Sequence, residues 1–421
     1  MPHHQIAIIG AGTAGITVAA QFLKKDKSLD IVIIDPSKDH WYQPAWTLVG
    51  ADTFDMEKTR RDQKDLIPKG AKWIQQKVAE LNAEKNELLL DNNVSLTYDY
   101  LVVAPGVQID LDGIEGLREA MGKGGVCSNY IDPEYTKKTL KEFKGGNAIF
   151  TQAATPIKCG GAPQKIMYLA AEMLKKNGVA NDTNIIFATP GSVVFGVKEF
   201  LPALMKVINR HAITVKFFHK ITKIDSNEKK VYFTITASDE SNCIAINEKQ
   251  SIGEEVTGEA TVAIKYDMLH LAPPQSAPDF IKRSNIAHKD GPNQGWANVN
   301  IHSMQNPDYP NVFALGDVAA LPTAKTGAAV RKQAPVVVDN ILKLIAGQKA
   351  SNEEYQGYSS CPLVTGYGKM VLAEFGYGNK RMSDPMISTF VDTTKEKYSM
   401  WLLKKYALPY MYWNLMLKGK A

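Results

Sequence analysis

A glycine-rich turn set between a strand and a helix constrains this chain more than any other feature. Gly10, Gly12 and Gly15 follow the apolar run 5–9, and a helical pattern continues to about Lys24. In such a turn the first glycine permits the tight bend, the second lets backbone approach a pyrophosphate, and the third lets the helix pack on the strand. The sequence therefore predicts a dinucleotide-binding βαβ unit at residues 5–35.

An acidic residue at the end of the next strand supports the same unit. The apolar run 31–34 ends at Asp35, which lies 20 residues beyond Gly15, where a carboxylate can accept hydrogen bonds from the ribose hydroxyls of an adenosine. The helix N-terminus is expected to face the phosphates, with Ala11 inside the turn. This fingerprint indicates a dinucleotide, but by itself it does not separate NAD from FAD.

Composition and charge exclude several functional classes. The chain has 421 residues, 44% hydrophobic and 22% charged, which is typical of a soluble globular enzyme of roughly two or three domains. A net charge of +5, without an arginine-rich arm or zinc-type spacing, predicts neither a nucleic-acid partner nor a metal site. The strand that starts at Gln5 leaves no room for a signal peptide, and no run of about 20 apolar residues predicts a spanning helix.

The chain also carries an internal echo. The segment 98–106 looks like a buried strand that runs into a turn, and 266–274 repeats its pattern, as expected for two related domains in tandem. The intervening strands 147–150 and 184–187 lead into loops without closely spaced glycines. We therefore predict an α/β fold with two tandem Rossmann-like domains, the second of which lacks an NAD(P)H site.

Two of the four cysteines are candidates for redox chemistry. Cys159 and Cys361 lie in segments framed by glycine and proline, which predicts turns that present a reactive side chain rather than an apolar core. Four cysteines without close pairing argue against a disulfide scaffold, so a bond between these two would be catalytic.

The two cysteines have unequal neighbours. A thiol with a pKa near 8.5 is only about 3% ionised at pH 7, so a nucleophilic cysteine needs help. Lys158 precedes Cys159, and a helical run begins at Ala162, so a cation and a helix N-terminus are both expected to favour its thiolate. Cys361 has no cation nearer in sequence than Lys369. Cys159 is therefore the predicted thiolate.

Several segments together resemble a known family. The loop 156–165, the segment around Cys361, the stretch 40–44 and the stretch 363–375 are similar to those of the sulfide:quinone oxidoreductases, in particular the type II branch that includes the mitochondrial enzyme. The strand 311–315 with Gly316 and Asp317 resembles the late FAD-contacting segment of the two-dinucleotide-domain flavoproteins. The resemblance implies FAD as cofactor.

The resemblance also implies roles for individual residues. Cys361 would receive sulfide and carry a persulfide, while Cys159 would pass electrons to FAD and FAD would pass them to ubiquinone or menaquinone. The implied cofactor-binding residues are Gly10, Ala11, Gly12, Gly15, Asp35, Gln43, Val78, Gly106, Gly316, Asp317 and Lys325. The domains would be 1–110 with 300–350 for FAD, 111–299 as the second Rossmann-like domain, and 351–421 as the C-terminal redox and membrane segment.

The other two cysteines have weaker claims. Cys127 lies where type I enzymes of the family carry a third cysteine that aids catalysis or holds the flavin, which departs from the closer type II pattern. We expect a free thiol near the flavin or the surface, with a catalytic role as the alternative. Cys243 falls in the polar stretch 238–259, which predicts an exposed hairpin or an insertion, and no role is expected for it.

The C-terminal segment combines aromatic and basic residues. The 12 residues 406–417 are uncharged and cannot span a bilayer of about 30 Å, but they can lie in its surface. Trp401, Tyr410, Tyr412 and Trp413 are the predicted quinone and membrane residues. The alternative is a core-packed helix pair or an oligomer interface. With the resemblance, we expect a peripheral, monotopic protein on the cytoplasmic face of a bacterial inner membrane.

Three functions stay open at this point. Sulfide:quinone oxidoreduction is favoured over a type II NADH:quinone reductase and over a non-catalytic flavin-binding electron-transfer subunit. Glutathione, sulfite, coenzyme A or sulfide could accept the sulfane sulfur, and a homo-oligomer is compatible with the sequence. The histidines show no metal spacing, and each is expected to be structural.

Overall fold

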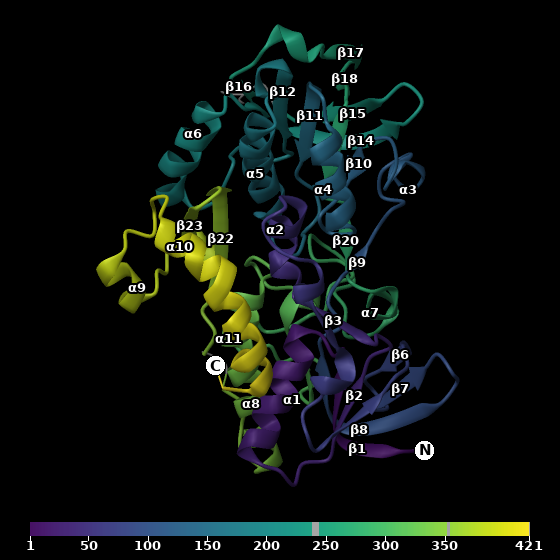
Figure 1. The fold of residues 1–421 in the computed structure, drawn as a ribbon. Helices are drawn as coiled ribbons and strands as arrows, with labels where there is room; N and C mark the ends of the chain where they lie inside the picture. Colours follow the sequence, from purple (N-terminus) through teal and green to yellow (C-terminus); the bar gives the residue numbers. More distant parts are fainter. Residues whose placement is uncertain (238–243, 352–353, 421) are drawn as a thin grey trace.

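The computed structural model describes residues 1–237, 244–351 and 354–420, and its first sheet is built on the predicted βαβ unit. The strands of this sheet run in the order β5-β2-β1-β8-β7-β6, and β21 also pairs with β8. They are β1 (His3–Ile9), β2 (Ile31–Ile34), β5 (Ala71–Ile74), β6 (Val78–Asn82), β7 (Glu87–Leu90), β8 (Ser95–Val103) and β21 (Val312–Ala314). Helices α1 (Thr13–Lys25) and α8 (Gly327–Ile345) pack together beside it (Figure 1).

A second, mainly parallel sheet follows the same plan. Its order is β10-β19-β11-β12-β13-β16. The strands are β10 (Val126–Cys127), β11 (Gly146–Thr151), β12 (Thr183–Ala188), β13 (Thr214–Lys216), β16 (Ala245–Ile246) and β19 (Met268–Leu271), and the helices of this part are α4 (Pro133–Glu142), α5 (Ala162–Lys176) and α6 (Leu201–Arg210). Since β11 lies between β12 and β19 as β1 lies between β2 and β8, the echo in the sequence marks equivalent strands, β8 and β19. The predicted tandem α/β architecture is confirmed.

The polar stretch 238–259 is an insertion between strands of the second sheet, and its described part ends in one strand of a hairpin. An antiparallel sheet contains β14 (His219–Asp225), β15 (Lys230–Ile235), β17 (Glu255–Gly258) and β18 (Thr261–Lys265). Within the described part of the insertion, β16 pairs with β13 and β17 pairs with β18, so the two strands join different sheets. Cys243 lies outside the described residues.

The C-terminal part contains a hairpin followed by a broken helix. Strands β22 (Ser359–Gly366) and β23 (Lys369–Phe375) precede α9 (Pro385–Phe390), α10 (Tyr398–Leu402), a π-helical turn (Leu403–Ala407) and α11 (Leu408–Asn414). Figure 1 shows this segment in yellow, running down one side of the molecule to α8 and α1, with α9 projecting outward. No helix in the described parts of the chain is long and apolar enough to cross a bilayer.

Short elements complete the fold. They are α2 (Trp46–Gly50), α3 (Leu117–Ala120), α7 (Asp279–Arg283), β3 (Asp39–Trp41), β4 (Arg60–Asp62), β9 (Gln108–Ile109) and β20 (Gln275–Ser276). The central strands are apolar on both faces, as expected for a parallel sheet covered by helices.

Candidate active site

The loop that carries Cys159 occupies in the second sheet the position that the glycine turn occupies in the first. It connects the end of β11 at Thr151 to the start of α5 at Ala162, as the glycine turn connects β1 to α1. The N-terminus of a helix carries a partial positive charge and is a common site for anions. The fold therefore holds Cys159 where the other domain would hold a phosphate.

Three parts of the chain fix this loop. Cys159 has a φ of +52°, a left-handed conformation that is uncommon for a residue other than glycine and that recurs at active sites. Its backbone N–H donates a 2.8 Å hydrogen bond to the carbonyl of Lys325, and the Tyr130 hydroxyl donates a 3.0 Å hydrogen bond to the Cys159 carbonyl. The loop is thus tied to the segment that precedes α8.

Cys361 is not in a turn, and that prediction is wrong. It lies within β22, opposite Ala373 of β23, and its side chain is buried in the same apolar cluster as α5. Proline at position 362 misled the prediction, because an edge of a two-stranded hairpin tolerates it. A methyl group on Gly161 would overlap the sulfur of Cys361, so the strand brings this sulfur directly against the Cys159 loop.

The two sulfurs are electrostatically unequal. The Cys361 thiol donates a hydrogen bond to the Cys159 sulfur. The Lys165 ammonium donates a second hydrogen bond to the same sulfur, with a length of 3.0 Å. These contacts hold the pKa of Cys159 well below its usual range, although burial opposes them. The same hydrogen bond and burial raise the pKa of Cys361 well above its usual range. Cys159 is the thiolate and Cys361 the protonated partner.

The cation that hydrogen-bonds to the thiolate is Lys165 and not the predicted Lys158, although the charges of Lys158 and Cys159 also act on each other. Lys165 lies in the first turn of α5, which brings its side chain back over the loop. Burial lowers the pKa of Lys158, and the nearby carboxylate of Asp317 opposes that effect more than the Cys159 sulfur does. Lys165 stood inside the cysteine motif, and helical spacing from Ala162 was the signal that could have identified it.

A second lysine reaches the cysteines from the C-terminal segment. Lys404, in the π-helical turn, is buried, and its ammonium donates a 2.8 Å hydrogen bond to the carbonyl of Pro44. Burial and the charge of Lys165 lower its pKa to about 7, whereas Cys159 and Cys361 act in the opposite direction. Sequence reasoning missed this residue, because it lies far from both cysteines along the chain.

The glycine fingerprint has room for a ligand at one face. Methyl groups on Gly10 or Gly15 would overlap backbone carbonyls, whereas a methyl group on Gly12 or on Gly106 would meet no atom within 4 Å. The Asp35 carboxylate accepts a 2.7 Å hydrogen bond from the N–H of Ala11. The backbone is therefore open at the position where a pyrophosphate would approach, as FAD binding requires.

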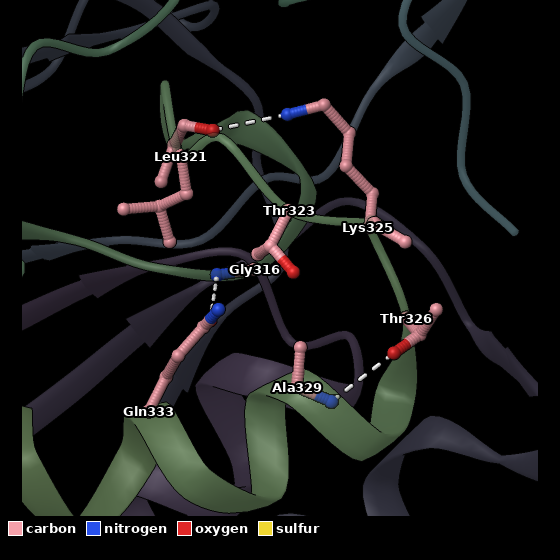
Figure 2. A pocket seen from close by; sticks show the side chains of 9 residues that line it. Gly316, Leu321, Thr323, Lys325, Thr326, Ala329 and Gln333 are labelled. Atoms are coloured by element: carbon pink, nitrogen blue, oxygen red, sulfur yellow. Dashed lines mark hydrogen bonds between the residues drawn. The ribbon is translucent and has the colours of Figure 1, made fainter. Parts of the chain in front are cut away.

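The late glycine and its neighbours line a cavity beside the cysteine loop, shown in Figure 2. Gly316 donates its N–H to the side-chain oxygen of Gln333, and the Lys325 ammonium donates a 3.0 Å hydrogen bond to the Ala319 carbonyl. Burial lowers the pKa of Lys325 to about 8, and burial raises the pKa of Asp317. Since Lys325 also binds the backbone of Cys159, the cavity and the thiolate share one residue. These residues fit FAD.

The other predicted cofactor residues lie nearby in the first domain. Gln43 is exposed at the start of a short 3₁₀ turn, Gln43–Ala45. Val78 begins β6 and is buried in the same apolar cluster as Ile9 and Ile34.

The aromatic residues predicted at the membrane differ in their exposure to solvent. Trp401 and Tyr412 are only 6% exposed, so the expectation that they face lipid is wrong; they lie on the apolar inner face of the C-terminal helices. The Tyr412 hydroxyl hydrogen-bonds to His40 Nε2 at 2.6 Å and to Thr13 Oγ1 at 2.8 Å. Trp413 is partly buried beneath the guanidinium of Arg61, and Tyr410 is exposed.

Cys127 is a free thiol in the core and not at the surface. It is fully buried in β10, opposite His270 of β19, and burial raises its pKa to about 12. A thiol of that kind is inert at neutral pH.

Comparisons with known proteins agree on one group. Residues 4–339 match the model of the pyridine nucleotide-disulphide oxidoreductase family. The chain is 38% identical to the mitochondrial sulfide:quinone oxidoreductase of Mus musculus, covering 99% of this chain and 87% of that protein. It is 39% identical to the one from Dictyostelium discoideum, over 99% of this chain and 86% of the relative. The solved sulfide:quinone oxidoreductase of Aquifex aeolicus has the same fold, with a TM-score of 0.77, 18% identity and coverage of 100% of this chain and 92% of that one.

Proposed function

Because this chain belongs to the pyridine nucleotide-disulphide oxidoreductases and, within them, to the sulfide:quinone oxidoreductases, we propose that Cys159 and Cys361 perform the sulfide half of its reaction. The protein is a FAD-dependent enzyme that oxidises sulfide and transfers electrons to quinone. The contact between the Cys361 thiol and the Cys159 sulfur, beside Lys165, is the observation that carries the proposal.

The unequal pKa shifts of the two sulfurs support one direction of the reaction. Hydrosulfide attacks Cys361 in a Cys159–Cys361 disulfide, the new S–S bond forms on Cys361, and Cys159 leaves as a thiolate. A thiol of lower pKa leaves faster, and Lys165 stabilises the departing charge. Bound FAD supplies the two-electron acceptor for Cys159 and the donor for quinone.

A cavity of about 220 Å³ opens beside Cys361. Aromatic side chains and uncharged polar groups line it, among them Phe187, Phe195, Phe375, Gln152 and Thr189. We assign to it the entry of sulfide and the removal of the sulfane sulfur by a small acceptor.

Two features of the second domain argue against NADH as the donor. The cysteine loop stands where a glycine turn would bind a pyrophosphate, and Thr189 follows β12 where Asp35 follows β2. Neither the backbone approach nor the ribose acid of a dinucleotide site is present at these two positions.

Anaerobic flavin absorbance tests the function. Sulfide should bleach the flavin absorbance of the purified protein within the time of one turnover, and a short-chain quinone should restore the absorbance. Bleaching by NADH and not by sulfide would contradict the proposal and would indicate an NADH:quinone reductase. Bleaching by neither compound would indicate a non-catalytic electron-transfer subunit.

A stripe of exposed apolar residues supports membrane binding. Tyr398, Leu402, Tyr406 and Tyr410 recur every fourth residue along the C-terminal helices and are exposed. Met386 and Phe390 of α9 are also exposed, the latter by 84%. We propose that these exposed residues of α9 and of the C-terminal helices lie in the membrane surface, and that the protein takes quinone from the membrane there.

The compartment predicted from the sequence lacks support. The relatives from Mus musculus and Dictyostelium discoideum are named mitochondrial, which does not favour the cytoplasmic face of a bacterial inner membrane. We propose that the protein attaches peripherally to a membrane. We also propose three domains, formed by residues 1–110 with 300–350, by residues 111–299 and by residues 351–421.

A further inference from the structure

The C-terminal helices contact the glycine turn of the first domain through one buried side chain. The hydroxyl of Tyr412 lies 2.6 Å from His40 Nε2 and 2.8 Å from Thr13 Oγ1. His40 Nδ1 in turn lies 3.2 Å from the carbonyl oxygen of Ala11. Tyr412 therefore reaches, directly or through His40, the two residues that flank Gly12 in the turn.

The direction of each hydrogen bond in this chain of groups follows from the carbonyl at its end. A carbonyl oxygen can only accept, so His40 Nδ1 carries a proton and donates to Ala11. Burial lowers the pKa of His40 to about 4, so the ring is neutral at neutral pH and Nε2 is an acceptor. The Tyr412 hydroxyl donates to Nε2, and the Thr13 hydroxyl donates to the Tyr412 oxygen. We call this chain of hydrogen bonds the Tyr412 bridge.

The Tyr412 bridge holds the turn without filling the place of a ligand. The Ala11 carbonyl accepts a second hydrogen bond, of 2.7 Å, from Gln63 Nε2, and the Ala11 N–H donates to Asp35. Both polar backbone groups of Ala11 are thus bonded within the protein. A methyl group on Gly12 would meet no atom within 4 Å, so the backbone stays open there for a pyrophosphate.

Further contacts fix the C-terminal segment on the helix that follows the turn. The ring centroids of Tyr412 and Tyr42 are 4.7 Å apart. At the other end of α1, the Lys24 ammonium donates a hydrogen bond to the carbonyl of Gly419, and a methyl group on Gly419 would overlap the backbone of Ala20. The segment 412–419 therefore lies against α1 from its first turn to its last, and the Tyr412 bridge is part of this docking.

We propose that Tyr412 and His40 are positioning residues for FAD, which hold the glycine turn in the conformation that binds the pyrophosphate. They act through Thr13 and Ala11 and do not themselves contact the reacting atoms. The C-terminal helices that carry the exposed apolar stripe would then also retain the cofactor. This role depends on the binding of FAD and not on the chemistry of the two cysteines.

The test measures how fast the purified holoenzyme releases FAD after dilution, from the flavin absorbance of the filtrate. Tyr412→Phe removes only the hydroxyl and should speed release about tenfold, the factor expected for the loss of one buried hydrogen bond. Thr13→Val should have a similar effect, whereas Thr13→Ser keeps the hydroxyl and should release FAD at the wild-type rate. Sulfide should bleach the FAD that stays bound at the wild-type rate in every variant.

Two further variants separate the bridge from general stability. Tyr232→Phe removes a tyrosine hydroxyl from β15, outside the bridge, and should release FAD like the wild type. His40→Asn combined with Tyr412→Phe should release FAD no faster than the faster of the two single variants, because both changes break the same chain of hydrogen bonds.

The outcomes distinguish this role from the proposed function. Wild-type release by both Tyr412→Phe and Thr13→Val overturns the positioning role. Faster release together with slower bleaching of the bound FAD also overturns it, since that combination indicates general damage. Absence of bleaching by sulfide in the wild type overturns the proposed function, and the release rates then still decide the role of Tyr412.

Discussion

The ammonium of Lys165 lies 3.0 Å from the sulfur of Cys159, six residues away in sequence but within one hydrogen bond in space. The contact forms because α5 starts three residues after Cys159 and turns the side chain of Lys165 back toward the loop. A cation at this distance, with a thiol donor on the other side, keeps Cys159 ionised.

Replacing Lys165 by methionine should raise the pKa of Cys159, because an adjacent positive charge favours the thiolate. The rate of flavin bleaching by sulfide should fall about tenfold at pH 6 and recover as the pH rises, since one pKa unit corresponds to a tenfold change in thiolate. A stopped-flow pH series measures it. Lys158→Met is the matched control, and an equal shift in that variant would contradict the assignment.

Serine at position 159 or 361 should abolish flavin bleaching by sulfide, because a hydroxyl can neither form the disulfide nor carry the persulfide. Cys127→Ala should retain most of the wild-type rate, since the Cys127 thiol is fully buried and un-ionised. Normal turnover in either serine variant would remove the dithiol mechanism.

Alanine at Gly161 should disturb the cysteine pair, because its methyl group would overlap the sulfur of Cys361. We expect Cys159 labelling by iodoacetamide in the reduced protein to require a higher pH, as the thiol donor is displaced. Gly160→Ala adds the same methyl group next door, where no atom lies within 4 Å, and should label like the wild type. Identical profiles for the two variants would speak against the steric explanation.

Glutamate at Phe390 should weaken binding to anionic lipid vesicles by at least tenfold, because a charge replaces an exposed apolar side chain of α9. Sedimentation with vesicles measures binding, and bleaching by sulfide in solution should be unaffected. Val256→Glu is the control, since Val256 is also highly exposed, at 82%, but lies on β17. Full vesicle binding by Phe390→Glu would exclude α9 from the docking surface.

Removal of everything after Ser399 is a poor test of membrane docking. That deletion would take away Trp401 and Tyr412, which are buried, and Lys404, which reaches the cysteines. Loss of membrane binding in such a variant could not be separated from damage to the core.

Local sequence predicted the parts of the fold that local interactions determine. The strands, the helix and the glycine turn of the first βαβ unit could be placed because each depends on residues within a few positions of one another. The echo between residues 98–106 and 266–274 likewise located equivalent strands in both sheets.

The arrangement of the site could not be predicted in the same way, because it depends on pairing between distant segments. Lys158 is adjacent to Cys159 but has Asp317 as its main charged partner. Lys404 acts on the sulfurs from the C-terminal helices, which pack on β23. Aromatic composition did not distinguish the exposed Tyr410 from the buried Tyr412, since that difference depends on which helix face meets the core.

The hydrogen bond between Tyr412 and Thr13 has a consequence for the order of folding. It joins α11 to the first residue of α1, and the Lys24 ammonium donates to the carbonyl of Gly419 at the other end of the same helix. The helix that follows the glycine turn is therefore synthesised early but obtains these contacts only after residues 412–419 have left the ribosome. Contacts so distant in sequence close slowly. We expect the nascent chain to acquire its flavin after translation and not during it.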